Sequence, residues 1–360
     1  MIPDSPINRL AEISLRLMGL WPGYAYSIVH RVIWTSAMCW SLIFQFRYFF
    51  VHLSSGDLPD LMDCLSITLS NSIFFIKLII LWIKNRVFNE ILTRMVDDWQ
   101  ECVNTKKNVE VMASRVTQSY RLSRYFVSSY IVSVSLFLVD FLLNEEKQFI
   151  LKVELPFNAT ESPYNELVNI QQFLSQFSAA TASSMLNALL LTLVSSLEIV
   201  RRELAEMSVI ARKHESCKRM LRYSITRHQK IIAFSGNIEN IFTYIALVQF
   251  VANTVIICSL GFVIITVNEF FFFSFLLKAF VLCFAGEFLS SRSVIIERAA
   301  YDTAWYELDP PESRILLIML IRSQRRLTLT AGKFMDLSLE GFAGMLKASG
   351  SYMSVLYAMY

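Results

Sequence analysis

Seven apolar stretches, separated in part by long polar segments, limit what this chain can fold into more than any other feature. Each stretch is long enough to cross a bilayer, which takes about 20 helical residues. With 54% hydrophobic and 18% charged residues, the chain has too little polar surface for a soluble fold. The sequence therefore predicts an all-α, seven-transmembrane helical bundle. The expected spans are residues 29–51, 60–83, 123–143, 166–197, 240–267, 269–291 and 336–359.

Three long polar segments lie between these spans, at residues 84–122, 198–239 and 292–335. Their mixed charges recur at helical spacing, so we expect all three to be helical. The third is broken by Asp309-Pro310-Pro311 and should continue as an amphipathic helix from Glu312 to Leu327. Residues 5–20 are expected to form a short amphipathic helix at a membrane face.

The distribution of basic residues predicts the orientation of the bundle. Most of the 33 Lys and Arg residues fall in the N-terminal segment and the three polar segments, whereas Arg47, Lys147 and Lys152 fall on the other side. Basic loops stay in the cytoplasm. We therefore expect an intracellular N-terminus and, after seven crossings, an extracellular C-terminus. The sequon at Asn158 lies in a loop predicted to be extracellular and is a candidate glycosylation site.

The motif content argues against an enzyme. The six cysteines have no C-x-x-C spacing, the four histidines form no H-E-x-x-H, and neither G-x-G-x-x-G nor a Walker loop occurs. We therefore expect no catalytic residues, no metal and no cofactor. A formal net charge of +3 also gives no reason to expect nucleic acid as a partner.

The last apolar stretch is the most polar of the seven and carries two open interpretations. Gly341, Gly344, Ala348 and Ser351 recur at three- and four-residue spacing, which suits either close helix packing or a water-lining face. Toward the C-terminus, Val355 and Met359 share a face. A ring of such residues would form a hydrophobic constriction that gates by dewetting, but the same residues could simply face lipid.

The C-terminal region contains motifs that resemble a known family, the insect odorant receptors. The matching motifs are Tyr301-Asp-Thr-Ala-Trp-Tyr306, Asp309-Pro310, Leu327-Thr-Leu-Thr-Ala-Gly-Lys-Phe334, Leu337-Ser-Leu-Glu340, Leu346-Lys-Ala-Ser349 and Ser351-Tyr352. Glu154 to Pro163 and Asn187-Ala-Leu-Leu resemble the hymenopteran branch. One departure is Gly350, because many members have Ser-Tyr-Ser-Tyr where this chain has Ser349-Gly-Ser-Tyr352.

The resemblance implies a ligand-gated, non-selective cation channel that passes Na, K and Ca ions through a central pore of a tetramer. It also implies an odorant-tuned subunit that pairs with a shared co-receptor, because the chain lacks the co-receptor's long cytoplasmic insertion. The domains are then a cytoplasmic amphipathic segment, a ligand-binding bundle of six spans with extended cytoplasmic helices, cytoplasmic anchor helices and a pore-lining seventh helix. Their residues are 1–28, 29–291, 292–335 and 336–360.

The resemblance also assigns candidate site residues. Val355 and Met359 fall at the family's gate positions, with Ser351, Ala348 and Gly344 as pore-lining residues. The odorant pocket is expected in the outer halves of the second, third, fourth and sixth spans, where an apolar cavity with a few hydroxyls suits a small volatile. Its candidate residues are Ser66, Ser70, Phe74, Ser135, Leu138, Phe173, Gln176, Phe177, Ala180, Phe272 and Phe275.

The sequence is also compatible with other functions. A gustatory-type channel has the same architecture but works without the co-receptor, and a metabotropic seven-span receptor has an extracellular N-terminus. A transporter or membrane enzyme is disfavoured, because neither a catalytic cluster nor an internal repeat occurs. The resemblance implies multi-pass insertion in the plasma membrane, specifically the dendritic membrane of olfactory sensory neurons.

Overall fold

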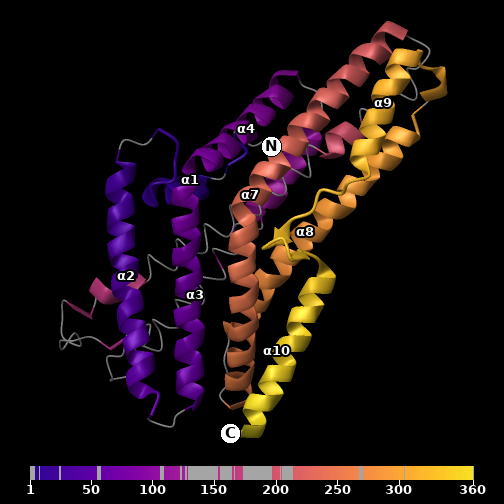
Figure 1. The fold of residues 1–360 in the computed structure, drawn as a ribbon. Helices are drawn as coiled ribbons and strands as arrows, with labels where there is room; N and C mark the ends of the chain where they lie inside the picture. The colour runs from indigo at the N-terminus through magenta and orange to yellow at the C-terminus, as the bar shows by residue number, and fades with distance from the viewer. Residues whose placement is uncertain are drawn as a thin grey trace.

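The computed structural model is helical over nearly all of the chain that it describes, which confirms the all-α prediction (Figure 1). The described residues are 5–7, 9–23, 26–54, 58–105, 109–121, 124–125, 128, 153–154, 164–165, 167–172, 197–202, 204, 214–266, 271–303 and 305–359. The helices are α1 (Arg9–Leu17), α2 (Ser27–His52), α3 (Leu58–Ile83), α4 (Asn85–Thr105), α7 (His214–Thr266), α8 (Phe271–Tyr301), η1 (Trp305–Glu307), α9 (Pro310–Ser323) and α10 (Leu339–Met359). The strands are β1 (Thr330–Ala331) and β2 (Met335–Asp336).

The helix α7 organises the molecule. It is a single helix of 53 residues, so it is about 80 Å long, far more than the roughly 30 Å of a hydrocarbon core. It therefore extends beyond the bilayer as one continuous rod. Figure 1 shows α3 beside one half of α7, with α2 on the far side of α3 and α10 along the same half of α7, while α4 and α9 lie toward the other end.

Four helical segments of the described chain are long and apolar enough to span a membrane: Ser27–His52, Leu58–Ile83, Lys218–Val263 and Ala279–Tyr301. The helix α10 is not among them, in keeping with its polar sequence. The expected spans at 123–143 and 166–197 lie almost entirely outside the described residues. The chain is a multi-pass membrane protein.

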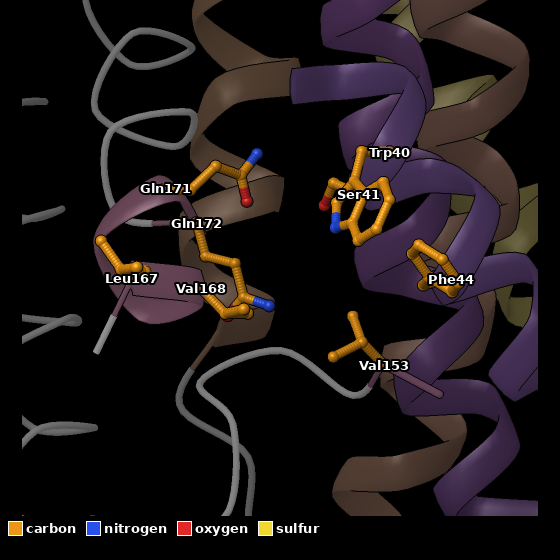
Figure 2. Close-up of a pocket in the computed structure, with 8 residues that line it drawn as sticks. All are labelled: Trp40, Ser41, Phe44, Val153, Leu167, Val168, Gln171 and Gln172. Atoms are coloured by element: carbon orange, nitrogen blue, oxygen red, sulfur yellow. The ribbon is translucent and has the colours of Figure 1, made fainter. Parts of the chain in front are cut away.

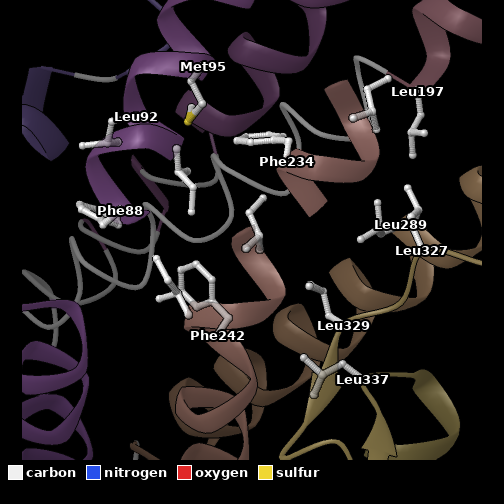
Figure 3. Close-up of a cluster of buried hydrophobic side chains, with 14 of the residues drawn as sticks. Phe88, Leu92, Met95, Leu197, Phe234, Phe242, Leu289, Leu327, Leu329 and Leu337 are labelled. Carbon is white, nitrogen blue, oxygen red and sulfur yellow. The ribbon is translucent and has the colours of Figure 1, made fainter. Parts of the chain in front are cut away.

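A hydrophobic core lies where α4, α7, α8 and the segment after α9 meet. Phe88 and Met95 of α4, Phe234 of α7 and Leu289 of α8 are almost fully buried in it (Figure 3). Leu329 reaches the same core from the segment between α9 and α10. Each fully buried side chain of this kind stabilises the fold by about 1.5–3 kcal/mol. This packing ties the segment that precedes α10 to the rest of the molecule.

The N-terminal helix α1 is fixed at one end of the bundle rather than lying free. The indole N–H of Trp82 donates to the carbonyl of Met18 at 3.0 Å, and that of Trp34 donates to the carbonyl of Leu17 at 2.9 Å. Gly19 turns the chain with a positive φ of 67°, and a Cβ there would lie 2.5 Å from the Ser27 carbonyl oxygen. The turn therefore requires glycine at this position.

The structure corrects the expected end of the amphipathic helix in residues 292–335 and the helical interpretation of the residues after it. The helix α9 ends at Ser323, not at Leu327, and β1 and β2 then form a short antiparallel hairpin. Leu327, Leu329 and Ala331 alternate as buried residues, which is the period of an extended strand rather than of a helix. Gly332 and Lys333 both have positive φ, which fixes the tight turn.

Candidate ligand pocket and pore helix

Three of the predicted odorant-pocket residues lie on α3 with described side chains. Ser66 is buried and donates its hydroxyl to the carbonyl of Met62 at 2.8 Å, and Ser70 donates to the carbonyl of Ser66 at 2.8 Å. Both hydroxyls therefore satisfy their own helix and keep lone pairs as acceptors. Phe74 is 4% exposed and belongs to the main hydrophobic core. In the structure, Phe74 therefore packs against other protein side chains.

The remaining pocket residues stay predictions. Phe272 and Phe275 lie in α8, but their side chains are not described. The other predicted positions fall outside the described residues, as does the sequon asparagine. These positions are Ser135, Leu138, Phe173, Gln176, Phe177, Ala180 and Asn158.

Sequence reasoning missed a buried polar network that joins α2 to α3. The amide nitrogen of Asn71 donates to the amide oxygen of Gln45 at 3.2 Å, and the amide nitrogen of Gln45 donates to the Ser41 hydroxyl at 3.4 Å. All three side chains are at most 5% exposed. A carboxamide in the middle of an apolar span costs free energy unless it is hydrogen-bonded, so the sequence alone indicated that Gln45 and Asn71 need partners. The sequence did not indicate that they pair with each other across two helices.

The helix α10 packs through one face only. Met345 and Ser349 are 1% exposed, and the Ser349 hydroxyl lies 3.1 Å from the carbonyl oxygen of Thr254 in α7 and 2.9 Å from that of Met345. Phe342 meets Phe280 of α8 edge to face, with ring centroids 5.5 Å apart. These contacts seat α10 in the groove between α7 and α8.

A second face of α10 is largely exposed in the described chain, and Gly344 on it lines a hollow together with Gly286 and Glu287 of α8. Gly344 and Ser351 are exposed, Ala348 is half-buried, and Val355 and Met359 are 57% and 80% exposed. These five residues follow one another at spacings of three and four and therefore share a face. The predicted pore-lining and gate residues thus lie together on the open side of the helix.

A set of hydrogen bonds fixes the hairpin before α10 onto α7. A carboxylate oxygen of Glu239 accepts from the backbone N–H of Thr330 at 3.0 Å, and its second oxygen accepts from the Thr330 hydroxyl. The N–H of Gly332 donates to the carbonyl of Thr243 at 2.9 Å. On the α8 side, a Cβ at Gly286 would collide with the carbonyl oxygen of Leu337. The start of α10 is therefore coupled to both α7 and α8.

A buried charge cluster joins α4 to the first part of α7. The guanidinium of Arg227, which is 7% exposed, donates to the Tyr223 hydroxyl at 2.7 Å, and that hydroxyl donates to Glu101 at 2.8 Å. Burial raises the pKa of the neighbouring Asp98 carboxyl, and the charge of Arg227 offsets part of that rise. A buried cation needs such partners, so the cluster fixes how α4 sits on α7.

Within the described residues, no group of three or more His, Cys, Asp or Glu side chains is arranged to hold a metal ion. The described helices define a class, a multi-pass helical membrane protein with a one-sided last helix. The profile of the family described as 7tm Odorant receptor matches residues 57–350. The chain belongs to this odorant receptor family.

Individual relatives are similar at low identity. Odorant receptor 85c of Drosophila melanogaster is 24% identical, with 92% of this chain and 91% of that protein covered. Odorant receptor 10 of Aedes albopictus is 29% identical over a shorter region that covers 38% of each chain. The chain thus spans well under half of the Aedes relative in that match, but nearly the whole of the Drosophila relative.

Solved structures support the same fold. The insect olfactory receptor OR5 from Machilis hrabei superposes with a TM-score of 0.77 at 15% identity, covering 98% of this chain and 97% of that one. The structure of the same receptor in complex with eugenol superposes with a TM-score of 0.76. At this identity the comparison establishes the fold alone.

Proposed function

We propose that this chain is the odorant-tuned subunit of a ligand-gated, non-selective cation channel that works with a shared co-receptor. A small volatile binds in the outer half of the bundle, its higher affinity for the open state shifts the equilibrium, and the pore lined by α10 opens. Na, K and Ca ions then permeate. The protein acts in the plasma membrane, in the dendrites of olfactory sensory neurons.

The observation that carries this proposal is the open face of α10. The helix α10 exposes Gly344, Ser351 and Ser354, and polar groups of this kind are not stabilised by contact with lipid. The helix as a whole is also too polar to be among the segments that could span a membrane by themselves. The same face presents water-compatible groups along most of its length and large apolar side chains near its end. That order suits a conduit followed by a hydrophobic gate at Val355 and Met359.

A second feature supports assembly into a tetramer. The helix α9 buries Leu316 and Met319 against the core, yet it also exposes Leu317, Ile318 and Ile321, which are 55%, 66% and 58% exposed. These three residues share a face, and the polar segment they belong to was predicted to lie in the cytoplasm. An apolar face in water calls for a partner, and other subunits at the cytoplasmic anchor would provide it.

The proposed ligand is a small volatile organic molecule. The comparison with a receptor structure that holds eugenol supports a small volatile as ligand here too. The hydroxyls of Ser66 and Ser70 on α3 leave acceptor lone pairs. An apolar pocket with a few such groups favours a compact organic molecule over a sugar or an ion.

The test is whole-cell current in cells that express this chain with and without an insect co-receptor, against a panel of volatiles, with G-protein signalling blocked. Odorant-evoked cation current only with the co-receptor supports the proposal. Current without the co-receptor favours the self-sufficient, gustatory-type alternative. No current in either case, with the subunit confirmed at the surface, contradicts the channel, and an extracellular N-terminal epitope would favour the metabotropic alternative.

A further inference from the structure

A cavity of about 170 Å³ lies between α2 and the helical segment 167–172 (Figure 2). Trp40, Ser41 and Phe44 line it from α2, and Leu167, Val168 and Gln172 line it from the other side. One wall of the cavity belongs to the first expected span, which contributes none of the residues predicted for the odorant pocket. The other wall is the start of the fourth expected span and ends just before Phe173, and none of the eight lining residues is a predicted odorant-pocket residue.

The walls of this cavity are held in place by hydrogen bonds. The amide nitrogen of Gln171 donates to the carbonyl oxygen of Ala37 at 3.2 Å, which fixes the 167–172 segment to α2. The backbone N–H of Glu154 donates to the carbonyl of Phe44 at 3.2 Å and fixes a second segment at the same helix. The rings of Trp40 and Phe44 pack edge to face with centroids 4.6 Å apart. The space between these walls is thus shaped by specific contacts.

The lining determines the chemistry of an occupant. Most of it is apolar, and an apolar cavity of about 150 Å³ is large enough to take up benzene. Ser41 is 5% exposed and accepts a hydrogen bond from Gln45, while its own proton meets no acceptor among the described residues. The indole N–H of Trp40, which only donates, likewise has no acceptor in the described part of the chain. An occupant should therefore have an apolar body and one acceptor oxygen.

The route of entry follows from exposure. Trp40 is 47% exposed and Leu167 is 60% exposed, and α2 is a candidate membrane span with only 11% of its apolar window buried. The mouth of the cavity therefore faces the hydrocarbon region. Small apolar compounds concentrate there, so a ligand reaches the cavity laterally from the bilayer.

We propose that this cavity is a second ligand site, which binds a benzene-sized carbonyl compound, such as an aromatic ketone or aldehyde, from the lipid phase. Its oxygen accepts from Ser41 and Trp40, and its body fills the space between Phe44 and Val168. A chain of hydrogen bonds from Ser41 through Gln45 to Asn71 connects the site to α3. This site is separate from the proposed channel function, because a ligand can occupy the cavity whether or not the pore conducts ions.

The test uses the full chain in phosphatidylcholine nanodiscs and a diazirine derivative of acetophenone as photoprobe. We expect saturable labelling of peptides that contain Trp40 to Phe44 or residues 167–172, displaced by acetophenone. Ethylbenzene has the same body without the carbonyl and should displace the probe less well. Trp40→Phe keeps an aromatic ring but removes the N–H, so it should weaken displacement by acetophenone about two- to tenfold.

Val168→Phe fills the cavity and should abolish this labelling. Ile43→Phe is the matched control, because Ile43 is 61% exposed on the same helix and does not line the cavity. Labelling that acetophenone cannot displace, or that persists in Val168→Phe, would be contact with bulk lipid and would overturn the proposal. Labelling found only after lipid removal would mean that an acyl chain occupies the cavity, which would also overturn it.

Discussion

The carboxylate of Glu239 in α7 accepts two hydrogen bonds from Thr330, one from its backbone N–H at 3.0 Å and one from its hydroxyl. Glu239 lies near the start of the expected fifth span, and Thr330 lies just before the helix that we propose lines the pore. The pair is therefore one of the contacts that join the ligand-binding bundle to the segment leading into α10. Thr243 strengthens the same joint through its hydroxyl, 3.1 Å from that of Thr330.

We predict that Thr330→Val loosens the hairpin on α7. The variant keeps the side-chain shape and the backbone N–H but loses a hydrogen bond to a charged group, worth about 1.5–3 kcal/mol. Hydrogen–deuterium exchange of residues 329–337 should become faster. Thr328→Val is the matched control, because the structure gives Thr328 no such bond to α7. An equal acceleration in both variants would contradict the role of Glu239.

We predict that Gly286→Ala destabilises the contact between α8 and the start of α10. Its Cβ would collide with the carbonyl oxygen of Leu337, which is backbone and has little room to move. Overpacking of this kind costs about 1–3 kcal/mol and should lower the thermal midpoint of the purified chain. Gly236→Ala is the control, because a Cβ there meets nothing within 4 Å. That control should be neutral or stabilising, and a similar loss in both would argue against close packing at Gly286.

We predict an acid-sensitive stability that depends on His228. Burial, together with the charge of Arg322 in α9, lowers the pKa of His228 from 6.5 to about 4. Between these two values the unfolded chain binds the proton and the folded chain does not, so stability falls as the pH drops. The full loss is about 3 kcal/mol.

The measurement is the thermal midpoint of the chain in detergent at about pH 7.5 and about pH 4.5. His228→Gln carries no charge at either pH and should lose part of the drop that the native chain shows. An identical pH dependence in both chains would mean that His228 does not titrate as its burial predicts.

We predict that Val355→Ala raises the basal current of the assembled channel, because a smaller side chain weakens a gate that closes by dewetting. Met359→Ala should act in the same direction. Leu356→Ala is the matched control, since Leu356 is half-buried on the packed side of α10. Unaltered gating and ion selectivity in a Val355→Ala subunit that still reaches the surface would remove this residue from the gate.

Much of the fold was predictable because membrane helices follow local rules. Length and apolarity alone predicted a membrane-spanning helix at residues 60–83, and α3 is observed at Leu58–Ile83. The spacing of small and polar residues predicted one face of α10 that would either pack closely or line water, and in the structure Gly344 and Ser351 of that face are exposed whereas Gly341 and Ala348 are half-buried. Both features depend on neighbours three or four residues away, which sequence periodicity reports directly.

Other features depend on contacts between distant segments, which periodicity does not report. The pairing of Gln45 with Asn71 requires two helices in one particular register. The hairpin before α10 was expected to be helical, and it became extended because Leu327 and Leu329 bury alternate side chains under α7 and α8. The α2 cavity was likewise invisible, since its two walls are more than a hundred residues apart.

In the proposed channel, the open face of α10 lines an aqueous pore. The most direct test is cysteine accessibility: Ser351→Cys, on the open face, is compared with Ser349→Cys, which replaces a side chain that is 1% exposed. Both are coexpressed with the co-receptor, and a charged methanethiosulfonate reagent is applied during odorant stimulation. We predict rapid, irreversible block of the current for Ser351→Cys and none for Ser349→Cys or the native chain. Surface-expressed, odorant-responsive Ser351→Cys channels that the reagent leaves unchanged would contradict the account.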